Sequence, residues 1–145
     1  SHAGSMRLLP TTGETMVNDH FSDVMGGGTI VSPMIWECTR FCLAPGGKPS
    51  TAAALMLAGG QVLNGLNITS FVGVFDAPML CIYGAIGSQP DGLGTVADIS
   101  VGLWQFTSDA QAKIARRARV TLGQMEHWFN RDFGCQESQR IAEQA

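Results

Sequence analysis

Residues 33–43 read PMIWECTRFCL, and this segment places two full charges, Glu37 and Arg40, among apolar side chains. A carboxylate within hydrogen-bond reach of an amine, directly or through one water, can accept its proton, so Glu37 is a candidate general base. A guanidinium nearby would favour the ionised carboxylate and fix its orientation. The two residue types therefore suggest proton transfer at this segment.

A strand over residues 33–43 would place the two charges on opposite faces, because side chains alternate along a strand. Glu37 would share a face with Thr39, and Arg40 would share a face with Cys38. A local bulge would turn both charges toward one cleft. The alternative is an edge strand that carries two solvated charges and no chemistry.

Arg7 is a third charge inside an apolar segment, RLLPTT. Residues 5–10 are typical of a short strand that ends at Pro10, because proline lacks the amide hydrogen that a sheet needs. A second charged strand raises the expectation of a polar site between strands.

The rest of the chain predicts alternating strands and helices, with a loop around Gly87, Pro90, Gly92 and Gly94. Such alternation indicates an α/β sheet with helices on its faces. The C-terminal part predicts one long helix over 108–133, which begins at Ser108 as its N-cap. The other predicted elements are helices at 14–25, 50–66 and about 78–86, and strands at 68–75 and 96–106.

Composition excludes several classes of protein. The chain has 145 residues, the size of one domain, and with 45% hydrophobic and 14% charged residues it can form a core. A net charge of −3 argues against nucleic-acid binding, and no apolar run approaches the roughly 20 residues of a membrane span. Cys38 and Cys42 have no second pair to complete a metal site, so we expect no metal and a cytoplasmic, reducing location.

Three segments carry a resemblance: GSMRLLPTTGETMVNDHF at 4–21, WECTRFCL at 36–43 and VADISVGLWQF at 96–106. In their order and spacing they resemble the acyl-homoserine lactone synthases, the autoinducer synthases of quorum sensing. The resemblance implies an acetyltransferase-like (GNAT-like) mixed sheet with helices on both faces. It also implies transfer of an acyl group from acyl carrier protein or acyl-CoA to the amine of S-adenosylmethionine, a substrate and not a cofactor, followed by lactone closure and release of methylthioadenosine.

The same resemblance suggests roles for individual residues. Arg7, Glu37 and Arg40 match the family's charged residues, so we expect them to be catalytic. A backbone amide freed by a bulge or a parting of strands near 37–43 would support the thioester oxygen as charge develops. The expected substrate contacts are Trp36, Thr39, Phe41, Val72, Gly73 and Val74.

The sequence also departs from the family pattern. We expect residues 1–107 to be the C-terminal two thirds of the family domain, without its N-terminal segment, and 108–145 to be a helical extension. Where the family has arginines and a tryptophan, this chain has Cys81, Gly84 and Ser88. That change favours a coenzyme A thioester as donor, or an inactive homologue.

Two other functions stay open: an acyl-CoA-dependent N-acyltransferase of another amine, and a non-catalytic homologue. The last predicted helix would pack on the core or on a second copy of the chain as a homodimer, with its basic residues facing solvent. In the alternative, those basic residues dock an acidic carrier protein. They are Arg116, Arg117 and Arg119.

Overall fold

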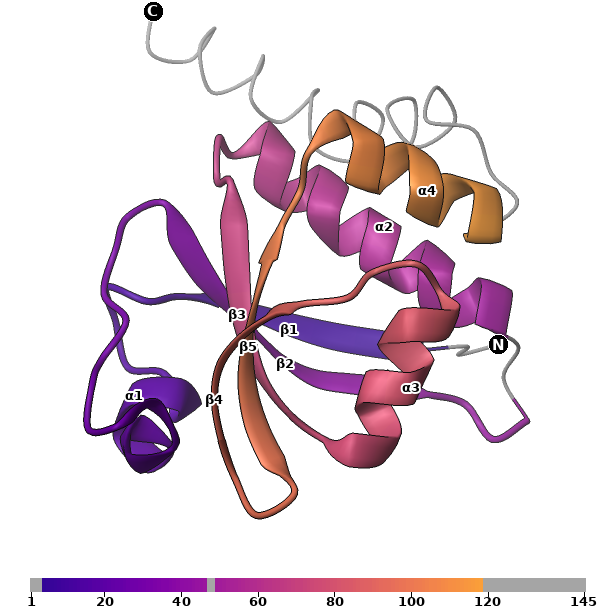
Figure 1. Ribbon diagram of the computed structural model, residues 1–145. Coiled ribbons are helices and arrows are strands. Elements are labelled where there is room, and N and C mark those ends of the chain that lie inside the picture. Colours follow the sequence, from indigo (N-terminus) through magenta and orange to yellow (C-terminus); the bar gives the residue numbers. More distant parts are fainter. Residues whose placement is uncertain (1–3, 47–48, 119–145) are drawn as a thin grey trace, which may run out of the picture.

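A five-stranded mixed sheet forms the centre of the computed structural model, which describes residues 4–46 and 49–118 (Figure 1). Among the strands of the described residues, only β2 and β3 are parallel neighbours, and the other three pairings are antiparallel. This arrangement confirms the expected α/β class. In the sheet order β1-β2-β3-β5-β4, the strands are β1 (Gly4–Pro10), β2 (Ile35–Leu43), β3 (Ser70–Asp76), β5 (Ile99–Gln105) and β4 (Asp91–Val96).

Helices cover both faces of the sheet (Figure 1). One face carries α2 (Pro49–Gly65), α3 (Ala77–Ala85) and α4 (Ser108–Ala118), and the other carries the short helix α1 (Met16–His20) with a 3₁₀ turn, η1 (Ser22–Met25). The predicted helix at 108–133 is present over 108–118, and its remainder lies outside the described residues. None of the helices in the described ranges is long and apolar enough to cross a membrane.

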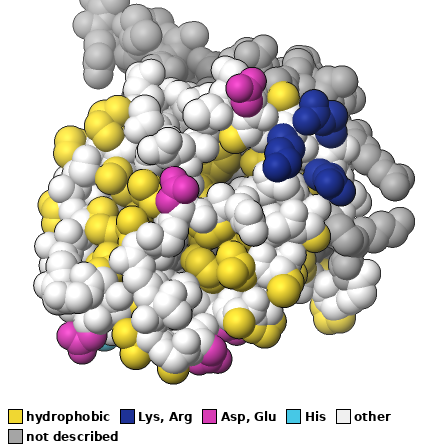
Figure 2. Space-filling model, viewed as in Figure 1, with side chains coloured by type: hydrophobic (Ala, Val, Ile, Leu, Met, Phe, Trp, Pro, Cys, Tyr) yellow, Lys and Arg dark blue, Asp and Glu magenta, His cyan; other side chains and the backbone are white. Residues whose placement is uncertain are grey.

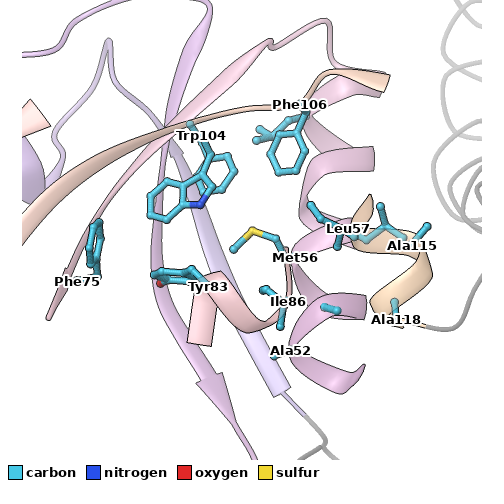
Figure 3. Packing of buried hydrophobic residues seen from close by; sticks show 14 of the residues in the cluster. Ala52, Met56, Leu57, Phe75, Tyr83, Ile86, Trp104, Phe106, Ala115 and Ala118 are labelled. Atoms are coloured by element: carbon cyan, nitrogen blue, oxygen red, sulfur yellow. The ribbon is translucent and has the colours of Figure 1, made fainter. Parts of the chain in front are cut away.

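Side chains of the strands divide between two cores, as period-two alternation requires. Phe71 and Trp104 point toward α2 and α3, whereas Val72 and Val101 pack with Val17 of α1. On the first face the rings of Phe71 and Trp104 stack at 4.8 Å between centroids. Figure 3 shows Trp104, Tyr83 and Met56 gathered between the sheet and the helices.

The predicted loop at 87–94 is partly wrong, because β4 begins at Asp91. Gly94 serves close packing, because a Cβ on it would collide with the carbonyl oxygen of Val24 in η1. The tight turn lies later, at Ala97, which has φ 56°, so β5 begins at Ile99 and not at 96. The contact of Gly94 with η1 is typical, because glycine inside a strand often marks a close approach of another backbone segment.

The predicted helix at 14–25 is interrupted. Phe21 leaves helical geometry with φ −126°, and its amide closes the last turn of α1 on the Val17 carbonyl. The chain resumes as η1 and ends at Gly26, which has φ 69°. The spacing of apolar residues therefore correctly predicted helical segments with a buried side, but the segment forms two short helices and not one continuous helix.

Candidate active site

β2 and β3 separate after the first three residues of each strand. Their pairing runs from Ile35–Ser70 to Glu37–Val72 and stops there, although β2 continues to Leu43. Beyond this point the facing strand edges no longer share a ladder, so backbone groups at the gap are available to a ligand. The structure thus contains the strand separation that the sequence predicted near 37–43.

β2 also carries the predicted bulge. Against β1, the register passes from Ser5–Cys42 to Arg7–Thr39, so β2 contains one extra residue over this step. Arg40 has φ 54°, a left-handed conformation that costs about 1–2 kcal/mol for a residue with a side chain. The bulge breaks the strict alternation of β2 and lets consecutive residues contribute to one cavity.

A cavity of about 60 Å³, here called the main cavity, opens where the two strands separate. A Cβ on Gly73 would lie 3.2 Å from the Cys38 carbonyl oxygen and 3.3 Å from the Trp104 ring, so glycine keeps the floor of the cavity open. The cavity is lined by Met16, Cys38, Thr39, Arg40, Phe41, Met56, Phe71, Gly73, Val74, Tyr83 and Trp104. Five predicted site residues are in this set: Thr39, Arg40, Phe41, Gly73 and Val74.

Glu37 lies behind the wall of the main cavity and does not line it. Its side chain is 0% exposed; one carboxylate oxygen accepts a hydrogen bond from the Met16 amide at 3.2 Å and the other from the Val17 amide at 2.6 Å. Anions are favourable at a helix N-terminus, so the carboxylate ties the start of α1 to β2. Because Met16 itself lines the cavity, Glu37 is one residue removed from it.

The arginines do not pair with Glu37. The Arg7 Nε donates to the Thr39 hydroxyl at 3.2 Å, and both Arg7 and Arg40 are exposed. Within residues 4–46 and 49–118 the structure records no ion pair between Glu37 and either arginine. The hypothesis that an arginine orients this carboxylate directly is therefore wrong; backbone amides do so.

Two predicted substrate contacts lie in the cores. Trp36 packs against the first core, on the side of α2, and Val72 is fully buried beside Val17 on the opposite face. Both belong to the paired part of the strands, before the gap begins. Neither of them lines the main cavity.

Six residues of the cavity wall were not predicted from the sequence, and two of them, Cys38 and Tyr83, are titratable. Burial, and then the nearby Glu37 charge, raise the pKa of the Cys38 thiol to about 12. Burial is also the largest cause that raises the pKa of Tyr83 to about 12. Both groups are protonated at neutral pH, so Cys38 is not a thiolate nucleophile. A lone tyrosine in the apolar segment MLCIYG was the feature that could have drawn attention to Tyr83.

A second, apolar pocket, here called the inner pocket, lies behind the main cavity and is closed by side chains. The two share Cys38, Met56 and Phe71 as a common wall. A polar mouth followed by an apolar interior suits a molecule with a reactive head and a hydrocarbon tail. The inner pocket is lined by Met6, Leu8, Cys38, Met56, Gly59, Gly60, Leu63, Phe71 and Phe106.

The sequence model of the autoinducer synthase family matches residues 2–83, which include β1, α1, β2 and most of α3 as far as Tyr83. The chain belongs to the autoinducer synthase family. An acyl-homoserine-lactone synthase of Rhizobium etli is 41% identical to it over 116 residues, 73% of this chain and 55% of that protein. The resemblance drawn from the three sequence segments is thereby confirmed.

Solved structures of the same family share the fold. A CoA-dependent acyl-homoserine lactone synthase, MesI, superposes with a TM-score of 0.73 at 24% identity, over 82% of this chain and 64% of that one. LasI gives 0.70 at 21% identity, over 77% and 62%. BjaI, solved with SAM and isopentyl-CoA, gives 0.70 at 20% identity, over 81% and 59%. The chain thus spans between half and two thirds of the length of these autoinducer synthases.

Proposed function

We propose that this protein is an acyl-homoserine lactone synthase. It transfers an acyl group from a thioester, carried on coenzyme A or acyl carrier protein, to the amine of S-adenosylmethionine. The amine nitrogen forms a bond to the acyl carbon, the thioester carbon–sulfur bond breaks, and the carrier leaves as a thiol. The carboxylate of the methionine part then closes the lactone and displaces methylthioadenosine.

The observation that carries the proposal is the gap between β2 and β3, with the main cavity at its base and the inner pocket behind it. A thioester arm is extended and rich in amides, so a free strand edge is a suitable partner for it. Side chains fill the apolar inner pocket in this structure, and an acyl tail would enter it by displacing the flexible side chains of Met6 and Met56. Family membership gives this geometry its chemical interpretation.

The charged residues have separate roles in this proposal. Carboxylate oxygens accept more than one hydrogen bond, so the amides of Met16 and Val17 leave Glu37 capacity to take the amine proton through one water. Arg40, exposed at the cavity, would bind the carboxylate of the amino-acid substrate, for which guanidinium geometry is suited. Arg7 acts through Thr39, to which it donates a hydrogen bond.

The test is direct product analysis. The full chain is incubated with S-adenosylmethionine and a panel of acyl-CoA and acyl-carrier-protein thioesters, and products are identified by mass spectrometry. We expect an N-acyl homoserine lactone and methylthioadenosine in equal amounts. A broad panel that gives neither product contradicts the proposal, and acyl transfer to other amines alone would favour the N-acyltransferase alternative.

A further inference from the structure

Tyr83 reaches the main cavity from α3 and is held there by aromatic neighbours. Its ring lies edge-on to Trp104 at 5.1 Å and 77°, and to Phe75 at 5.6 Å and 86°. Phe41 on the bulged part of β2 approaches it at 6.2 Å and 68°. The side chain is only 5% exposed, so its orientation is fixed by packing (Figure 3).

The Trp104 ring, against which Tyr83 packs, is itself held in place by a hydrogen bond and by stacking. The Trp104 indole donates to the Ser88 carbonyl oxygen at 2.9 Å, which ties the loop after α3 to β5. Phe71 stacks on that indole, with 4.8 Å between the ring centroids. Tyr83 therefore has a fixed position relative to β2 and β3. A catalytic group needs such a fixed position, because catalysis depends on its orientation toward the reacting atom.

The Tyr83 hydroxyl has no hydrogen-bond partner within the described residues, 4–46 and 49–118. Among the described residues, the fully buried polar side-chain atom without a partner is Thr15 Oγ1, so the Tyr83 hydroxyl is open to the main cavity. Tyr83 lines the main cavity together with Cys38 of β2 and Gly73 of β3, beyond the point where the pairing of these strands stops, so it lies at the gap between them. Because the phenol has a raised pKa and keeps its proton at neutral pH, it is a donor there and not a base.

We propose that Tyr83 is a catalytic residue whose hydroxyl donates a hydrogen bond to the carbonyl oxygen of the acyl thioester. The inference rests on the proposed acyl transfer. As the amine adds to the acyl carbon, the carbonyl electron pair moves to oxygen, and the hydroxyl stabilises that negative charge without giving up its proton. When the carbonyl re-forms, the thiolate leaves and receives the proton that the base took from the amine.

Tyr83→Phe tests the role with little change to packing, since it deletes only the hydroxyl. We expect kcat for lactone formation to fall about 100-fold, the usual scale for one oxyanion donor, with the KM for S-adenosylmethionine and the Tm nearly unchanged. Ile86→Val is the matched control: it removes one buried methylene near the end of α3, outside both cavities, and should lower Tm slightly while kcat is retained. A Tyr83→Phe variant with full kcat overturns the inference and leaves the proposed function standing.

A second measurement does not depend on turnover. A ketone analogue of the acyl donor, with a methylene between the carbonyl and the sulfur of coenzyme A, binds but cannot be cleaved. Its carbonyl stretch in the infrared should lie at lower frequency on the wild-type chain than on Tyr83→Phe. Equal frequencies overturn the donor role even if kcat falls.

The two measurements separate the two claims. A frequency shift on a wild-type chain that makes no lactone supports the Tyr83 donor and contradicts lactone synthesis. Failure of the wild-type chain to bind the analogue on either carrier, coenzyme A or acyl carrier protein, overturns both.

Discussion

The Glu37 carboxylate on β2 and the Val17 amide at the start of α1 are joined by a buried hydrogen bond of 2.6 Å between residues 20 apart in sequence. The same carboxylate also accepts from the Met16 amide. The candidate base is thus also the anchor of a helix that forms part of the cavity wall. Removing the carboxylate removes both the candidate base and the anchor of α1. Each role therefore needs a variant that changes that role alone.

Glu37→Gln should lower turnover by at least about 100-fold, the scale for loss of a general base. The glutamine amide has one oxygen to accept a bond, and its NH₂ would face an amide hydrogen of α1. Leaving one buried donor unsatisfied should lower the free energy of unfolding by about 1–3 kcal/mol. Turnover is measured by lactone yield and stability by urea unfolding; near-full activity would exclude Glu37 as the base.

Met16→Pro separates the anchor from the base. Proline is well tolerated at the first position of a helix, and Thr15 before it already has the extended conformation that proline requires. The substitution deletes one amide that binds Glu37 and leaves the carboxylate intact, while Met16→Ala deletes the same side chain and keeps the amide. The effect of the amide alone is the loss of turnover in Met16→Pro relative to Met16→Ala. If this loss equals the loss that Glu37→Gln causes relative to the wild-type chain, the carboxylate acts by positioning α1.

Arg40→Gly should stabilise the fold and lower activity. Glycine adopts φ 54° without the penalty of about 1–2 kcal/mol that a side chain incurs, so Tm should rise. Loss of the guanidinium should raise the KM for S-adenosylmethionine. Ala97→Gly at φ 56° in the turn between β4 and β5 is the control, with a similar gain in Tm and no change in KM. An unchanged KM in Arg40→Gly would remove Arg40 from the site.

Much of the fold follows from local pattern. The helix expected at 50–66 is observed at Pro49–Gly65, and the strand at 5–10 is observed at Gly4–Pro10. Alternation also gave the correct face of Glu37, but it could not supply its partners, because those amides lie on a separate helix. Tyr83 escaped notice for a similar reason: its place at the cavity depends on where β2 and β3 separate, which is a tertiary feature. Glycines were ambiguous, since Gly94 serves contact with η1 and not a loop.

Gly59 and Gly60 of α2 should respond oppositely to alanine. Alanine favours a helix over glycine by about 1 kcal/mol. A Cβ on Gly59 would lie 2.6 Å from the sulfur of Met6, a flexible chain that can move, so Gly59→Ala should be neutral or stabilising. A Cβ on Gly60 would lie 2.5 Å from the rigid Phe106 ring, so Gly60→Ala should destabilise by about 1–3 kcal/mol. Equal effects in thermal unfolding would contradict this account of the inner pocket.

Alkaline pH should weaken the fold through Cys38 and Tyr83. Both have a pKa raised to about 12, from 9.0 for the thiol and 10.0 for the phenol, so the native state holds more protons than the unfolded state above pH 9. Their contribution to stability is complete below pH 9 and is lost as pH rises toward 12. Cys38→Ala should flatten this part of the stability profile. In native protein at pH 8, residue-resolved alkylation should modify the exposed Cys42 and Cys81 and spare Cys38.

The last turns of α4 carry a basic surface. Arg116 and Arg117 are exposed in its last turn, as expected, and Lys113 is exposed one turn earlier; Arg119 lies outside the described residues. Figure 2 shows Lys and Arg side chains gathered on this side of the molecule. Such a group attracts an acidic partner most strongly when salt is low. Replacing Arg116 and Arg117 with serine should therefore raise the KM for an acyl carrier protein about tenfold at low salt and little at high salt.

An uncharged donor provides the control for this surface. Acyl-pantetheine carries the same reactive arm without the acidic protein, so the double variant should use it as well as the wild-type chain does. Acyl-CoA, with its phosphates, distinguishes a general anion effect from protein docking: a KM that rises for both donors indicates phosphate attraction. An unchanged KM for the carrier protein at low salt would show that the arginines are solvated surface charges, because weak screening is the condition under which docking charges act most strongly.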